Sequence, residues 1–88
     1  MKHIIVDFNL FIMKQNIMVY SEGECLKQVE VPLDFKKICS TLYSLRKEYD
    51  VYYIDLCGPE DLSNKVKENF CLNYDCKNYT FNNITRGY

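Results

Sequence analysis

Residues 34–57, DFKKICSTLYSLRKEYDVYYIDLC, decide the fold of this chain. Their first part repeats apolar side chains at helical spacing, and their last part, residues 51–57, is a continuous apolar run. Asp34 suits the helix N-cap, because its carboxylate can accept hydrogen bonds from the free backbone N–H groups of the first turn. The stretch therefore predicts an amphipathic helix followed by a parallel strand that is covered on both faces. The apolar helix positions are Phe35, Ile38, Cys39, Leu42, Leu45 and Tyr49.

The sequence before this helix has the pattern of β-strands. Residues 3–8 form a short apolar run typical of a central strand, and Asp7-Phe8-Asn9 has turn chemistry. A long second strand is expected from apolar residues that alternate along one face, namely Phe11, Met13, Ile17 and Val19. Residues 21–24, SEGE, suit a hairpin turn, and residues 25–31 suit an edge strand. Together these segments predict a three-stranded antiparallel meander.

The sequence after residue 57 predicts a second helix and a last strand. Gly58-Pro59-Glu60-Asp61 begins this helix, with proline at its first position and two acids near the positive end of the helix dipole. Its inner stripe is Leu62, Val66 and Phe70, and residues 77–84 alternate as a strand. Residues 85–88 are expected to be frayed. The prediction is one α/β domain over residues 1–88, with a single mixed sheet and the order β-β-β-α-β-α-β.

This element order resembles the ribonuclease-H-like architecture, which is also found in each half-domain of the actin-like ATPases. An aspartate closes the first strand in Ile4-Ile5-Val6-Asp7-Phe8-Asn9, as in that family. Nucleases with this architecture place carboxylates around one or two metal ions. An ATPase of this architecture would need glycine-rich turns after the first and fourth strands, and the first turn contains no glycine.

Two strand-borne aspartates are the candidate catalytic residues under the nuclease alternative. Asp7 lies at the position of the family's first-strand aspartate, and Asp55 lies in the fourth strand. Parallel pairing of the two strands would bring both carboxylates to one end of the sheet, where they could hold Mg²⁺ or Mn²⁺. The first helix offers only Glu48 as a third acid, so the set is incomplete. The interpretation favoured here is a protein without catalytic residues and without a cofactor.

Cysteines are the next candidates for chemistry. The chain has five, an odd number, and no N-terminal signal sequence, so we expect reduced thiols that pack as small apolar residues. Cys71 and Cys76 are the only pair with a spacing that approaches that of zinc ligands, and no second pair accompanies them. His3 is the only histidine available as a base for a cysteine nucleophile, so that chemistry is not expected.

Charge and hydropathy limit the classes of partner. Eleven basic and twelve acidic residues are scattered along the chain and give a net charge of −1. A nucleic-acid binder needs a basic stripe, and none is visible. An acid at Asp7 comes too early for a signal peptide, and no apolar run reaches the roughly 18 residues that span a bilayer. We therefore predict a cytoplasmic protein without a membrane partner.

Aromatic and basic residues alternate near the end of the chain, at Tyr74, Lys77, Tyr79 and Arg86. Tyrosine is enriched at protein–protein interfaces, so these four residues are the predicted interface. The same aromatics suit core packing of a last strand, and aromatics beside cations can also stack on single-stranded nucleic acid. Nucleic-acid binding without catalysis is the third alternative.

Composition indicates the source of the chain. It contains no alanine, although alanine is the best helix former, and it is rich in residues with AT-rich codons. An AT-rich genome, such as that of a low-GC bacterium or its phage, explains this bias. In size and composition the chain resembles the small accessory proteins of phages and mobile elements. The function expected from this resemblance is a non-enzymatic protein-binding module that inhibits a host protein, such as a CRISPR or other defence effector, in the host cytoplasm.

Overall fold

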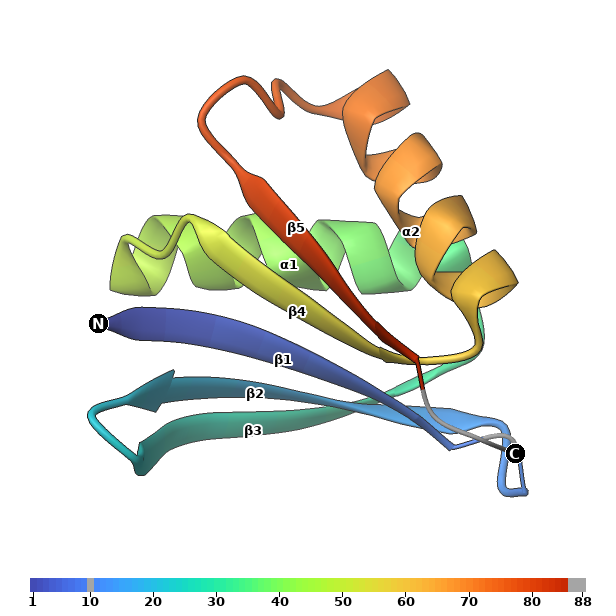
Figure 1. The fold of residues 1–88 in the computed structure, drawn as a ribbon, viewed down its shortest axis with the longest axis horizontal. Helices are drawn as coiled ribbons and strands as arrows, with labels where there is room; N and C mark the ends of the chain where they lie inside the picture. The colour runs from blue at the N-terminus through green and yellow to red at the C-terminus, as the bar shows by residue number, and fades with distance from the viewer. Residues whose placement is uncertain (10, 86–88) are drawn as a thin grey trace.

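The computed structural model describes residues 1–9 and 11–85, and these form five strands and two helices. The order of elements is β-β-β-α-β-α-β, which confirms the order expected from the sequence (Figure 1). In chain order the elements are β1 (Lys2–Asn9), β2 (Lys14–Ser21), β3 (Glu24–Pro32), α1 (Phe35–Tyr49), β4 (Tyr53–Gly58), α2 (Glu60–Asn73) and β5 (Thr80–Thr85).

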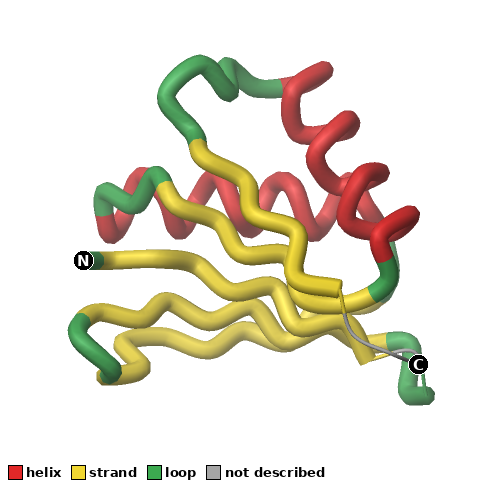
Figure 2. Tube along the Cα trace, in the orientation of Figure 1, coloured by secondary structure: helices red, strands yellow, loops and turns green. Residues whose placement is uncertain are grey.

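The five strands form one mixed sheet in the order β3-β2-β1-β4-β5. β2 is antiparallel to both of its neighbours, whereas β4 is parallel to β1 and to β5. The two crossovers, β3-α1-β4 and β4-α2-β5, step across the sheet in the same direction. Because such crossovers are right-handed, both helices fall on the same face, and α1 contacts α2 there. Figure 2 shows the helices and strands of this arrangement separately coloured.

The core lies between this face of the sheet and the two helices. Ile4, Val6 and Phe8 alternate inward from β1, and Val66 and Phe70 face them from α2. The opposite face of the sheet carries no helix among the described residues. The prediction that the fourth strand is covered on both faces is therefore wrong. Ile54 and Leu56 face the helices, whereas Tyr53 and Asp55 alternate with them on the open face, so the strand has one covered face.

Local sequence signals explain where α1 begins and where β2 turns into β3. The carboxylate of Asp34 accepts hydrogen bonds from the backbone N–H groups of Lys36 and Lys37, at 3.0 and 3.3 Å, as predicted for the N-cap. Glu22 and Gly23 both have positive φ angles, 52° and 80°, as a two-residue type I′ hairpin requires.

The long second strand predicted through Phe11 and Met13 is wrong. Residues 11–13 form a turn, and β2 begins at Lys14. Met13 has a φ of 52°, which breaks the extended conformation. The side chain of Asn9 accepts a hydrogen bond from the backbone N–H of Phe11 at 3.1 Å and so closes the turn. Ile17 and Val19 do face the core, as predicted.

Other boundaries differ by a few residues. β1 continues to Asn9 instead of turning at residue 7, and α2 begins at Glu60, with Pro59 as its N-cap. β5 begins at Thr80, because residues 75–79 form the connection from α2. β5 also includes Thr85, the first residue of the tail predicted to be frayed, and residues 86–88 lie outside the described part.

Candidate functional site

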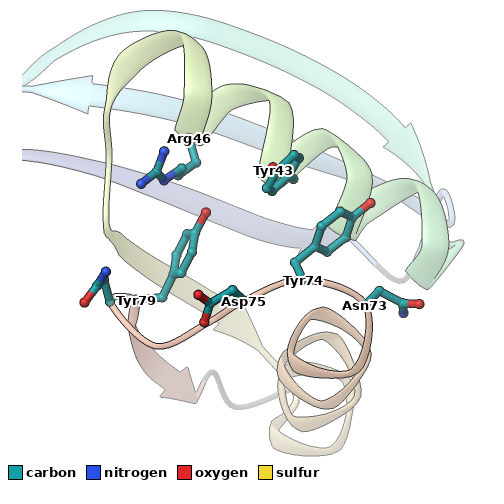
Figure 3. Close-up of a pocket in the computed structure, with 7 residues that line it drawn as sticks. Tyr43, Arg46, Asn73, Tyr74, Asp75 and Tyr79 are labelled. Carbon is teal, nitrogen blue, oxygen red and sulfur yellow. The ribbon is translucent and has the colours of Figure 1, made fainter.

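A pocket lies between α1 and the connection from α2 to β5, and it contains two of the residues predicted as an interface. Its volume is about 350 Å³. Figure 3 shows side chains from α1 on one side and from the connection on the other. We call it the tyrosine pocket, and its lining residues are Tyr43, Arg46, Asn73, Tyr74, Asp75, Asn78 and Tyr79.

Aromatic packing holds the walls of the tyrosine pocket. The rings of Tyr43 and Tyr74 are stacked, with centroids 4.5 Å apart and planes 18° apart. Phe70, which is fully buried, contacts both Tyr74 and Tyr79, with centroid distances of 5.1 and 4.8 Å. Tyr74 and Tyr79 are thus half-buried side chains that pack on the core and also line the pocket.

The other two predicted interface residues are not part of the tyrosine pocket's lining. Lys77 is exposed, and its backbone N–H donates a hydrogen bond to the carboxylate of Asp75 at 3.1 Å. Arg86 lies outside the described residues. The sequence prediction therefore found two pocket residues but missed Arg46 and Tyr43, because both lie on a helix that is distant in sequence.

Two opposite charges line this pocket. Nη2 of Arg46 donates a hydrogen bond to the hydroxyl of Tyr52 at 2.7 Å, and the guanidinium lies 4.6 Å from the centroid of that ring. Asp75 is exposed on the opposite side. Neither Arg46 nor Asp75 forms an ion pair with any residue that the structure describes. The side chains of Arg46 and Asp75 are therefore each available to bind a charged group of a ligand.

The hydroxyl of Tyr79 has no hydrogen-bond partner among the described residues, although it is buried. Burial raises the pKa of Tyr79, and the charge of Asp75 adds to this, while Arg46 opposes it. The hydroxyl is therefore protonated at neutral pH and is a donor without an acceptor. Buried polar groups without a partner are rare in folded proteins and call for an explanation.

Replacing Tyr79 by phenylalanine tests this assignment. Because the variant removes only the unpartnered hydroxyl, we expect the free energy of unfolding to stay the same or to rise by about 1 kcal/mol. The matched change Tyr52→Phe removes the acceptor for Arg46 and should lower the free energy of unfolding by about 1 kcal/mol. Urea denaturation measures both. A loss of stability in Tyr79→Phe as large as that in Tyr52→Phe would show that the hydroxyl has a partner.

A disulfide joins Cys71 and Cys76, whose Cα atoms are 5.3 Å apart. The prediction that both thiols stay reduced is therefore wrong, and a paired cysteine cannot serve as a zinc ligand. The pairing follows from the chain reversal after α2, which brings Cys76 back beside the last turn of the helix. Disulfides are rare in reducing compartments, so the cytoplasmic location remains a prediction that this pair does not support.

The three other cysteines form no disulfide, and two of them, Cys39 and Cys57, are buried. Burial raises the pKa of the Cys39 thiol to about 11. Its Sγ donates a hydrogen bond to the backbone carbonyl of Val66 at 3.5 Å. Cys39 is therefore a packing residue with little thiolate at neutral pH, as expected from the sequence.

The two candidate catalytic aspartates lie on neighbouring strands and on the open face of the sheet. In the register of β1 and β4, Asp55 pairs with Ile5 and Asp7 pairs with Cys57, so the aspartates are offset by two residues. Asp55 accepts hydrogen bonds from Nδ1 of His3 at 2.8 Å and from Nδ2 of Asn82 at 3.1 Å. In residues 1–9 and 11–85, no group of three His, Cys, Asp or Glu side chains could hold a metal ion.

Three adjacent apolar side chains are exposed in the turn between β1 and β2. Phe11 is 91% exposed, Ile12 54% and Met13 53%. We call them the apolar tip. The sequence analysis wrongly included Phe11 and Met13 in the alternating pattern of β2. The run LFIM after Asn9 does not alternate with polar residues, and this absence of alternation favours a loop. The apolar tip and the tyrosine pocket lie at opposite ends of the molecule (Figure 1).

Two comparisons with known proteins give no relative for this chain. A scan against models of protein families finds no match, and a search of curated proteins finds none at a significant level. None of the described helices is long and apolar enough to cross a membrane.

Proposed function

We propose that the chain is a non-enzymatic protein-binding module whose main contact is the apolar tip. The main evidence is that Phe11 is 91% exposed and lies beside two further exposed apolar residues. Contiguous exposed apolar side chains mark interaction sites. Full burial of such a side chain contributes about 1.5–3 kcal/mol. The partner supplies a concave apolar pocket, because the apolar tip protrudes from the end of a hairpin.

Hydrogen bonds at the base of the turn hold the apolar tip in place. The backbone N–H of Asn9 donates to the side-chain carbonyl of Gln15 at 3.0 Å, and the backbone N–H of Leu33 donates to the carbonyl of Met13 at 3.1 Å. A preorganised loop loses less entropy on binding. These bonds favour a protein partner of fixed shape.

Charge beside the apolar tip also favours a protein over an anionic lipid surface. Lys14 follows the tip directly, but its ammonium group lies 3.3 Å from the carboxylate of Glu30. The positive charge of Lys14 is therefore already neutralised by Glu30. The open face of the sheet at this end adds one further exposed apolar residue, since Ile84 is 47% exposed and pairs with Cys57.

We further propose that the partner is a host protein and that the chain is a phage or mobile-element inhibitor of it. The absence of alanine supports this origin, because it fits an AT-rich genome. A defence effector with an apolar pocket at a functional surface would be blocked by an inserted apolar tip.

Removing the apolar tip should abolish capture of the partner without unfolding the chain. We expect Phe11→Ser combined with Ile12→Ser to change stability by less than about 0.5 kcal/mol, because both residues are exposed. Loss of an interface anchor costs about 2 kcal/mol or more, so capture should fall more than tenfold. The measurement is affinity capture from lysate of a low-GC bacterium, with quantitative mass spectrometry.

The matched control is Leu72→Ser, which removes an apolar side chain that is 83% exposed on α2. The proposal requires one protein to be captured by the wild-type chain and by this control, and to be lost with the apolar-tip variant. Equal capture by all three chains would contradict it.

A further inference from the structure

We propose that the tyrosine pocket binds a free α-amino acid, with the ligand carboxylate on Arg46 and Tyr79 and the ligand ammonium on Asp75. The proposal does not depend on the apolar tip, which lies at the other end of the molecule. It assigns a ligand to the unpartnered groups that the fold places around one cavity.

The size of the cavity favours a small ligand. Its volume of about 350 Å³ is at the low end of the roughly 300–1,000 Å³ of small-molecule sites. A ligand of amino-acid size fits this space, whereas a dinucleotide or a long peptide does not.

Arg46 and Tyr79 provide the carboxylate-binding side. A guanidinium has five N–H donors in a fixed fork, and the structure assigns one hydrogen bond to it, the one to Tyr52. That bond and the adjacent Tyr52 ring fix the position of Arg46 and leave donors for a bidentate carboxylate contact. The hydroxyl of Tyr79 points toward the α1 side of the pocket, where Arg46 lies (Figure 3). A ligand carboxylate there would give this buried donor the acceptor that it lacks.

Asp75 provides the ammonium-binding side, because it is the one carboxylate among the described residues that line this pocket. Asp75 is held by the hydrogen bond from the backbone N–H of Lys77. The disulfide between Cys71 and Cys76 encloses Asp75 and restricts its movement.

The combination of charges selects a zwitterion. One cation and one anion line the cavity without pairing with each other. A simple anion would be attracted by Arg46 but repelled by Asp75, and a simple cation would experience the reverse. A ligand whose ammonium and carboxylate groups are bonded to the same carbon atom satisfies the two residues together. Such a site selects its ligand by repulsion as well as by attraction.

The test is an NMR titration of the ¹⁵N-labelled full chain with single L-amino acids. We expect saturable shifts in the backbone amides of residues 73–79 and of Arg46 for at least one of them. The N-acetyl and the amide derivatives of that amino acid should each bind at least about tenfold more weakly, because each lacks one charge. Acetate and methylammonium are the single-charge probes. Shifts from either probe as large as those from the amino acid would overturn the proposal.

Variants locate the site. Tyr79→Phe and Asp75→Asn keep the shape of the side chains, and the asparagine oxygen can still accept from Lys77. Each should weaken binding about tenfold, while the Tyr79→Phe chain stays at least as stable as the wild type. Lys37→Gln, an exposed charge change on the same helix as Arg46, is the control and should bind like the wild type. Wild-type affinity in Tyr79→Phe, or no shift with any amino acid at about 10 mM, would overturn the proposal.

Discussion

Replacing Phe70 by alanine is expected to lower the free energy of unfolding by about 4 kcal/mol. Phe70 is fully buried on the inner face of α2. Its ring contacts those of Tyr74, Tyr79 and Phe81, with centroid distances of 5.1, 4.8 and 5.7 Å. Truncation therefore removes apolar burial and leaves a cavity between α2 and β5. Urea denaturation followed by circular dichroism measures the loss.

The control for Phe70→Ala lies two residues further along the same helix. Leu72 is 83% exposed, so Leu72→Ala should change stability by less than about 0.5 kcal/mol. Small domains have only about 5–15 kcal/mol of stability in total, so the Phe70 variant should be close to unfolding at room temperature. A loss below about 1 kcal/mol would mean that Phe70 is not the centre of this cluster.

Replacing Gly58 by alanine should lower stability by about 3 kcal/mol, through two effects that add. Gly58 has a φ of 154°, a conformation that side-chain-bearing residues rarely adopt. A Cβ atom there would also lie 2.9 Å from Cβ and Cδ2 of Phe8. Phe8 is buried in the core and cannot move aside without displacing its neighbours.

Gly23→Ala separates the two effects. Gly23 also has a positive φ, 80°, but a Cβ atom there would meet nothing within 4 Å. Replacing Gly23 should therefore lower the free energy of unfolding only through the unfavourable backbone conformation, by about 1 kcal/mol. Equal losses at Gly58 and Gly23, measured by urea denaturation, would show that the contact with Phe8 contributes nothing.

Local patterns in the sequence were sufficient to predict the fold. The helical spacing from Phe35 to Tyr49 and the N-cap at Asp34 depend on residues close in sequence, so they could be recognised without a structure. The type I′ turn at Glu22 and Gly23 is also a local feature. The order of elements followed from these local signals, read one after another along the chain.

The candidate sites could not be predicted in the same way. The tyrosine pocket depends on Arg46 in α1 and Asp75 after α2 lining one cavity, although no local pattern links the two segments. The disulfide was missed because the odd number of cysteines and the expected cytoplasmic location favoured free thiols. The apolar tip was missed because the alternation of Ile17 and Val19 was extended across the turn that the side chain of Asn9 closes.

Site-specific photocrosslinking shows whether the apolar tip contacts a protein partner. A benzophenone amino acid replaces Phe11 in one chain and Leu72 in a second, since both positions are highly exposed and apolar. We expect the chain labelled at position 11 to crosslink to one protein in lysate of a low-GC bacterium, and the chain labelled at position 72 not to do so. Crosslinking to that protein from position 72 but not from position 11 would contradict the claim, and so would crosslinking of neither chain to any protein.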